Sequence, residues 1–245
     1  MQKFIYEIAN KILMNEVERD LLKFVKTKKR IFFDIGCYSG NFTSNLIKFN
    51  NKNTTSKYYL FDPNPKSKEY CKQILKNTNT KFFQLALDNS NKTKKFVINR
   101  YYEASGSSLN SAHQKDKLYN LTRKVFFKCF QPFNKIKDYE KIEVQTQTLD
   151  NFCRIKKIKR IDLLKIDTEG TEEKILLGAK KLLSRKKIDL IYIEVSGFKN
   201  TFNKKFNRIS RFLSQYNFEL VKTWEIKSLG WLSNLKATDN LFVRK

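Results

Sequence analysis

The chain has 245 residues, a length that suits one α/β domain. Hydrophobic residues make up 40%, enough for a buried core, and no apolar run approaches the roughly 18 residues needed to cross a membrane. Charged residues interrupt every apolar stretch near the N-terminus, so we expect no signal peptide and a cytoplasmic location. The four cysteines and the single histidine lack the spacing of zinc ligands, so no metal centre is predicted.

The formal net charge of +26 has two explanations that the sequence leaves open. It favours a polyanionic partner such as nucleic acid, an anionic membrane or an acidic glycan. Lysine far outnumbers arginine, however, as compositional drift would produce. The densest cluster, Arg154–Arg160, directly precedes a predicted strand. It should therefore lie at the amino edge of the sheet, away from any ligand.

The N-terminal region, residues 1–28, predicts an amphipathic helix, with apolar side chains at helical spacing over 3–26. An apolar strand at 31–35 follows and breaks at a glycine turn before a helix at 41–49. Such a turn points backbone N–H groups at a ligand, and Gly36 and Gly40 would let that ligand approach closely. Asp34 favours a cationic or hydroxyl-rich ligand over a pyrophosphate.

The second strand, 57–61, leads into Asp62-Pro63-Asn64-Pro65. An acidic residue there, about 20 residues past the glycine turn, is typical of a side chain that binds ribose hydroxyls. The full G-x-G-x-x-G fingerprint is absent, so the glycines alone equally suit a structural turn. Together with Asp62 they favour a nucleoside ligand.

Strands and helices continue to alternate, which predicts a parallel sheet within a single domain spanning 1–245. Residues 100–140 interrupt the alternation with an aromatic, basic insertion, interpreted as a lid or substrate platform. Its Ser107, Ser108 and His113 are candidate substrate contacts, although the serines also suit a turn and the histidine a solvated loop. The remaining predicted elements are helices at 66–77, 171–183 and 202–215, strands at 81–86, 94–99, 142–148, 161–166 and 188–195, and a closing antiparallel pair at 218–224 and 240–243.

Acidic residues cluster after two central strands. Asp167 and Glu169 follow strand 161–166, and Glu194 ends the next strand. They could act as a general base, hold substrate hydroxyls or bind a divalent cation. Glu172 better suits capping of the following helix, whereas Asp167 ends a central strand and needs a partner.

Several segments, in the same order, resemble the motifs of FkbM-type methyltransferases. Leu163–Glu172 resembles the family's "LKIDVEGAE" stretch, and Phe61–Pro65 resembles its "EPNP" with Asp62 in place of glutamate. The other matching segments are Asp34–Gly40, Gln84–Asp88, Ser105–Leu109, Thr146–Asp150 and Ile175–Ala179.

The resemblance implies a class I methyltransferase fold: a Rossmann-like, seven-stranded, mostly parallel sheet with an antiparallel final strand. It also implies S-adenosylmethionine as donor and O-methylation, often of sugars, glycans or related metabolites. Asp167, Glu169 and Glu194 become the catalytic candidates. The expected donor-site residues are Asp34, Gly36, Cys37, Gly40, Asn41, Asp62, Asn64, Leu85 and Ala86.

Two other functions remain open beside methylation of a small-molecule or glycan acceptor. The charge favours RNA ribose methylation, but no lysine-based catalytic tetrad can be placed, and Lys165 is not an obvious base. A non-catalytic protein that binds nucleic acid or membrane on the same fold is the other alternative, and the intact acidic residues argue against it.

Overall fold

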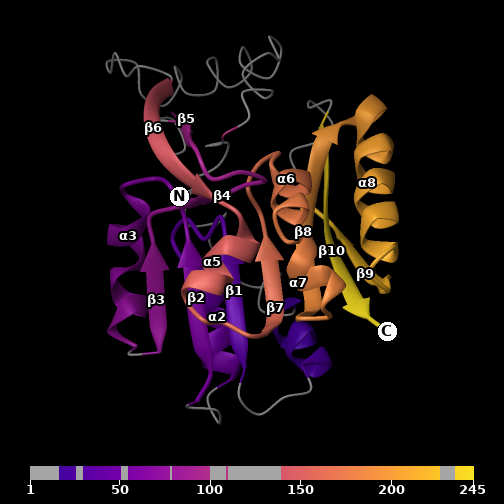
Figure 1. The fold of residues 1–245 in the computed structure, drawn as a ribbon, viewed down its shortest axis with the longest axis horizontal. Helices are drawn as coiled ribbons and strands as arrows, with labels where there is room; N and C mark the ends of the chain where they lie inside the picture. The colour runs from indigo at the N-terminus through magenta and orange to yellow at the C-terminus, as the bar shows by residue number, and fades with distance from the viewer. Residues whose placement is uncertain are drawn as a thin grey trace, which may run out of the picture.

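The computed structural model describes residues 17–25, 30–50, 55–77, 79–99, 109, 139–226 and 235–245. Its main sheet has seven strands in the order β3-β2-β1-β7-β8-β10-β9 (Figure 1). β10 runs antiparallel to both of its neighbours, and the other pairs are parallel. The predicted mostly parallel sheet with an antiparallel final strand is therefore confirmed. The strands are β1 (Ile31–Ile35), β2 (Lys57–Phe61), β3 (Thr80–Phe83), β7 (Ile161–Ile166), β8 (Ile188–Phe198), β9 (Phe218–Glu225) and β10 (Leu235–Arg244).

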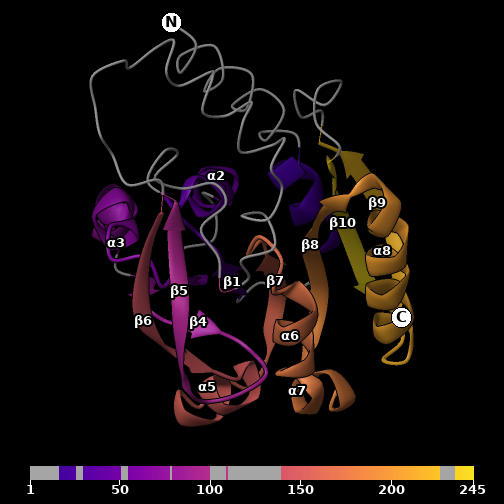
Figure 2. The same ribbon diagram turned by 90° about the horizontal axis from the view of Figure 1, so that it is seen from above.

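Helices cover both faces of this sheet, as seen from above (Figure 2). One face carries α2 (Asn41–Phe49), α3 (Ser67–Tyr70) and the helical residues 17–24. The other carries α5 (Leu149–Ile155), α6 (Glu172–Leu177), α7 (Lys180–Ser184) and α8 (Lys199–Ser214). Within the described residues, no helix is long and apolar enough to cross a bilayer.

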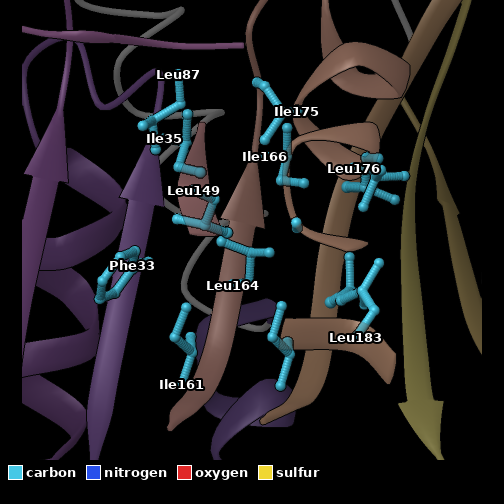
Figure 3. Packing of buried hydrophobic residues seen from close by; sticks show 14 of the residues in the cluster. Phe33, Ile35, Leu87, Leu149, Ile161, Leu164, Ile166, Ile175, Leu176 and Leu183 are labelled. Atoms are coloured by element: carbon cyan, nitrogen blue, oxygen red, sulfur yellow. The ribbon is translucent and has the colours of Figure 1, made fainter. Parts of the chain in front are cut away.

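The central strands are continuous apolar runs because helices bury them on both sides. All six residues of β7 are buried. Alternate residues supply two cores. On the α5–α8 side, Leu164 and Ile166 of β7 pack with Ile175 of α6 (Figure 3). On the α2 side, Leu163 packs with Leu21 and Leu46.

Four predicted elements differ from the structure, two strands and two helices. The strand predicted at 81–86 ends at Phe83, because Ala86–Leu87 (β4) pairs with β6 (Tyr139–Gln147) in a separate sheet of order β4-β6-β5. β6, predicted as an edge strand, is therefore central in that sheet, between β4 and β5 (Thr93–Asn99).

The helices predicted at 171–183 and 66–77 are each divided in two. The first breaks between α6 and α7 at Gly178, where a Cβ would lie 2.2 Å from the Asp88 carbonyl oxygen. The second consists of α3 and the 3₁₀ helix η1 (Cys71–Lys76). Most of the predicted insertion at 100–140 lies outside the described residues, as do Ser107, Ser108 and His113.

Candidate active site

Strand pairing brings ionisable side chains into two rows at the carboxyl edge of the sheet. Asp34 of β1 lies opposite Lys165 of β7, which lies opposite Tyr192 of β8. Two residues further along these strands come Asp167 and Glu194, and Glu194 lies opposite Asp239 of β10. Side chains two residues apart on a strand share a face, so both rows point to the α2 side of the sheet. This register therefore brings Asp34, Asp167 and Glu194 to one face of the sheet.

Lys165 is the buried cation that joins the two rows. Its Nζ lies 3.0 Å from Asp34 Oδ1 and 3.2 Å from Asp167 Oδ2. Burial by itself lowers the pKa of Lys165, but the two carboxylates more than offset this and raise the pKa above its usual value. Lys165 points to the opposite face of the sheet from Ile166, and that face carries the candidate site. Because it stays charged, it holds Asp167 in place and cannot act as a base.

Asp34 is more enclosed than the sequence suggested. Its side chain is 3% exposed, and Thr43 Oγ1 donates to Oδ2 at 2.8 Å while Lys165 occupies Oδ1. Both carboxylate oxygens therefore already have protein donors. Asp34 is therefore held by protein contacts at the base of the loop after β1, and a direct contact with the methyl donor stays a prediction.

The loop after β1 uses its N–H groups differently from the expectation. The N–H groups of Gly36 and Cys37 both donate to the Phe61 carbonyl, at 2.9 and 3.2 Å, and that of Tyr38 donates to Asp62 Oδ2 at 2.9 Å. They are therefore not directed at a ligand, and the loop ties β1 to the end of β2.

The two glycines are required for packing within the protein. Gly36 has φ +77°, and a Cβ there would lie 1.7 Å from the Asp167 carbonyl oxygen. Gly40 has φ +72°, and its Cβ would lie 2.5 Å from Ile74 Cδ1. Both backbone conformations are unfavourable for other residues. Packing alone thus accounts for both glycines, and their contact with a ligand stays a prediction.

Asp62 lies at the end of β2, as expected for a ribose-binding carboxylate. Its two oxygens accept N–H groups from Tyr38 and Asn64, at 2.9 and 2.8 Å. Burial raises its pKa to about 6, and these hydrogen bonds only partly counter that effect. Each oxygen keeps a lone pair, since a carboxylate accepts about four hydrogen bonds. Asp62 can therefore still receive hydroxyl donors.

The second row contains carboxyl groups that are readily protonated. Burial and the nearby Asp167 carboxylate raise the pKa of Glu194 well above its usual value. The same two causes raise the pKa of Asp239 to about 6, although the Tyr192 hydroxyl donates to it and lowers the pKa. A carboxyl group with a pKa close to neutral suits proton transfer at physiological pH.

Asp239 and Tyr192 are site residues that the sequence analysis missed. The alternation of β10 places Asp239 on the same face as Leu241, but a single acidic residue in an antiparallel strand carries no signal by itself. The aromatic face of Tyr192 stacks on Phe42, with ring centroids 5.6 Å apart, and Trp224 packs edge-on at 5.9 Å. These rings form one wall of the acidic site.

Glu18, in the helical residues 17–24, was also missed. It is fully buried, its Oε1 accepts from Asn45 Nδ2 at 3.1 Å, and its Oε2 has no hydrogen-bond partner in the part of the chain described. Burial raises its pKa to about 7, opposed in part by the Asn45 bond and the charge of Lys165. An unsatisfied buried carboxylate oxygen is suited to a cationic or hydroxyl-bearing ligand.

Glu172 has a structural role, but it holds the loop before α6 rather than capping the helix as predicted. Its Oε1 accepts from Gly170 N at 2.8 Å and Thr168 N at 3.2 Å, and its Oε2 pairs with Lys205 at 2.9 Å. Burial would raise its pKa, but Lys205 and the Gly170 N–H hold the pKa below its usual value. This clamp shapes the loop in which Glu169 adopts φ +56°.

The remaining predicted donor residues lie along the same edge. Asn64 is buried beside Asp62, and Asn41 begins α2 as an exposed residue. Leu85 and Ala86 follow β3, whose last residue pairs with the last residue of β2. Cys37 is buried in the apolar core on the α2 side, and burial raises the pKa of its thiol. Only its backbone is thus well placed for the donor, and all these assignments stay predictions.

The strand order, the loop after β1 and Asp62 after β2 together define a class I methyltransferase that uses S-adenosylmethionine. The residues present suit that donor: Asp62 can take hydroxyl groups, and the acidic edge with the unsatisfied Glu18 oxygen suits its positive charges. Among the described residues, no group of three or more His, Cys, Asp or Glu is arranged to hold a metal ion.

The chain belongs to the FkbM methyltransferase family, whose domain model matches residues 34–220. A relative from Sinorhizobium fredii, 2-O-methyltransferase NoeI, is 22% identical over 188 residues, covering 74% of this chain and 69% of NoeI.

Similar solved structures include one methyltransferase and one protein determined with AdoMet. A precorrin-6y C5,15-methyltransferase from Geobacter metallireducens has a TM-score of 0.45 at 10% identity. The aligned part covers 94% of this chain and 88% of the precorrin-6y methyltransferase chain. M. jannaschii TYW2, determined with AdoMet, has a TM-score of 0.40 at 15% identity, with 95% and 77% covered.

Proposed function

We propose that this enzyme transfers a methyl group to a hydroxyl of a neutral sugar, glycan or related metabolite. The observation that carries the proposal is the row of acidic side chains Asp167, Glu194 and Asp239, at the same edge of the sheet as Asp62 and separated from it by β1. NoeI, named as a 2-O-methyltransferase, supports oxygen as the methylated atom.

In the proposed arrangement, Asp62 binds the ribose hydroxyls and the loop 36–40 lies along the donor. Bound S-adenosylmethionine supplies an electrophilic methyl on a sulfonium. The protein's task is to bring an acceptor oxygen to that carbon and to remove the hydroxyl proton.

Asp167 or Glu169 is proposed to orient and deprotonate the acceptor hydroxyl. The Asp167 side chain is 32% exposed, so a solute can reach it, and Lys165 fixes its position. Asp239 is then suited to take up the proton, because a carboxyl group with a pKa of about 6 is largely ionised at neutral pH and still accepts a proton readily. The proton of the acceptor hydroxyl is thus passed to a carboxylate of the protein and is not released directly to water.

The charge of the site bears on the acceptor. Asp167 and Asp239 share a face with Lys165, whose single positive charge is outweighed by the two carboxylates of Asp34 and Asp167. A phosphate backbone would meet net negative charge there. This supports a neutral or cationic acceptor over RNA, although the net charge of +26 by itself favours RNA.

The test has two stages. Calorimetry with S-adenosylmethionine and S-adenosylhomocysteine measures donor binding, and transfer of a radiolabelled methyl is then assayed on neutral sugars, glycans, sugar phosphates and RNA. We expect transfer to neutral hydroxylated acceptors. Transfer to RNA alone would overturn the proposed acceptor, and donor binding without transfer to any acceptor would support a non-catalytic protein.

Asp167→Asn separates chemistry from donor binding. The amide keeps the size of the side chain but cannot accept a proton, so turnover should fall by about 10²–10⁴-fold. Donor affinity should change little. Glu173→Gln, which breaks a solvent-exposed ion pair with Arg208, is the matched control and should retain activity. Unchanged turnover in Asp167→Asn would remove Asp167 from the mechanism.

A further inference from the structure

Two basic segments, separate in the sequence, meet at the amino edge of the sheet. One connects α5 to β7, and the other runs from α7 into β8. The strands pair from their first residues, Ile161 with Ile188, and Ile161 N donates to the Lys187 carbonyl at 2.8 Å. Asp150 of α5 also accepts the N–H groups of Lys181 and Leu182, which ties the helices together. Figure 1 shows both connections at the lower ends of β7 and β8.

We call these exposed cations the basic face: Arg154, Lys156, Lys157, Lys159, Arg160, Lys180, Lys181, Arg185, Lys186 and Lys187. Arg160 pairs with Asp162 and Asp189. In the described structure, no other cation of the basic face forms an ion pair. Compositional drift would scatter lysines over the whole surface. Here the fold places two cation-rich segments beside each other, which creates a strong local positive potential.

The basic face also carries an exposed apolar side chain. Ile155 is 52% exposed and lies between Arg154 and Lys156. An apolar group framed by lysines suits the boundary between lipid headgroups and acyl chains. Binding of single-stranded nucleic acid normally uses exposed aromatic rings, and neither segment of the basic face contains an aromatic side chain.

We propose that the basic face binds the surface of an anionic lipid membrane. Each lysine or arginine near such a surface contributes favourably to the binding free energy. Insertion of Ile155 adds a hydrophobic contribution that salt does not screen. The candidate active site lies at the opposite ends of the strands. β1 and β7 have five and six residues, which at about 3.3 Å per residue separates the site from the basic face by roughly 15–20 Å. When the basic face is bound to a membrane, the candidate active site would therefore point away from the membrane, toward the water.

Vesicle co-sedimentation tests the proposal with the full chain and without donor or acceptor, so its outcome is independent of the proposed reaction. The vesicles contain phosphatidylcholine alone or mixed with phosphatidylglycerol. We expect binding only to the mixed vesicles, weakening as sodium chloride rises. A variant carrying Lys156→Glu, Lys159→Glu, Lys180→Glu and Lys187→Glu should lose affinity by on the order of a hundredfold or more.

A charge-matched control shows whether the location of the charges matters. Lys68→Glu, Lys72→Glu, Lys199→Glu and Lys204→Glu change exposed lysines elsewhere and lower the net charge by the same amount. This control should keep most of the vesicle affinity. Equal losses in the two variants would overturn the proposal, as would the absence of binding to mixed vesicles. Circular dichroism confirms that both variants fold.

Ile155→Ser distinguishes a membrane from a soluble polyanion. It should weaken vesicle binding several-fold at every salt concentration and leave retention of a single-stranded RNA oligonucleotide unchanged. RNA binding that depends on the same four lysines and exceeds vesicle binding at equal salt would assign the basic face to nucleic acid instead.

Discussion

At the scale of single residues, the site depends on one buried cation. Lys165 Nζ contacts Asp34, Asp167 and the Gly36 carbonyl, the last at 3.4 Å. It also lies over the Phe42 ring, 5.4 Å from the centroid. One side chain thus connects the loop after β1, the proposed catalytic carboxylate and α2. Asp34 would otherwise be a buried charge without compensation.

Lys165→Met should therefore destabilise the fold strongly. Removing one partner of a buried pair leaves an uncompensated charge, which typically costs about 3–5 kcal/mol of unfolding free energy. Urea denaturation measures this loss. Lys245→Met breaks an ion pair whose partners are 70% and 57% exposed and should cost about 1 kcal/mol or less. Similar losses in both variants would show that Lys165 is not the central cation.

Asp62 provides a prediction about pH. Its raised pKa of about 6 means that it becomes protonated as the pH falls through 6. The protonated group accepts ribose hydroxyls less well, so donor affinity should be highest above pH 7 and fall below pH 6. Calorimetric titration of S-adenosylhomocysteine across this range measures the change. Asp62→Asn should bind weakly at every pH. A wild-type profile that is flat between pH 5 and 7 would contradict the ribose assignment.

Folding stability responds to the same group in the opposite sense. A carboxyl group with a raised folded-state pKa favours the folded state most below its unfolded value, and this contribution is lost as the pH rises through about 6. The ionised Asp62 that is proposed to bind the donor thus weakens the fold at neutral pH, and bound donor should compensate for this loss.

At the scale of elements, the loop after β1 joins three strands. Gly36 leaves no room for a Cβ beside the Asp167 carbonyl, so the turn after β1 and the end of β7 pack directly. Because Asp167 N also donates to the Ile35 carbonyl at 3.0 Å, the two strand ends behave as one unit. A displacement of the loop would move Asp167, the proposed catalytic carboxylate.

Gly36→Ala should accordingly impair both stability and donor binding. The added methyl would lie 1.7 Å from a backbone oxygen, at a φ unfavourable for alanine. We expect a loss of about 3 kcal/mol or more in unfolding free energy. Gly197→Ala in β8 is the control, since the nearest atom lies 3.9 Å from the new Cβ. It should cost about 1 kcal/mol or less. Comparable effects would refute the packing argument.

The main sheet could be predicted from the sequence because its central strands are uninterrupted apolar runs between glycine and acidic turns. The division of 171–183 at Gly178 could not, since it depends on a contact with Asp88, distant in the chain. Site residues in motifs, such as Asp62 and Asp167, were found at the expected edge. Glu18 and Asp239 were missed because only packing and strand pairing bring them to the site.

At the scale of the whole molecule, charge is distributed along the strand direction. Carboxylates gather at the carboxyl edge, and the basic face occupies part of the amino edge. The net charge of +26 therefore conceals an acidic site. A cationic donor and a neutral acceptor can approach that site although the protein as a whole attracts polyanions.

Salt should stabilise this fold. Positive charges repel one another in the compact state, and sodium chloride screens that repulsion, with a Debye length falling from about 10 Å at 0.1 M to about 3 Å at 1 M. The Lys165 pairs are buried and lose little by screening. The melting temperature should therefore rise by roughly 3–6 °C between low and high salt, as measured by calorimetry.

Each of the two fourfold Lys→Glu variants carries less net charge and should show a smaller rise, because less repulsion remains to be screened. A melting temperature that falls with salt would mean that exposed ion pairs, such as that between Lys222 and Asp20, outweigh the repulsion.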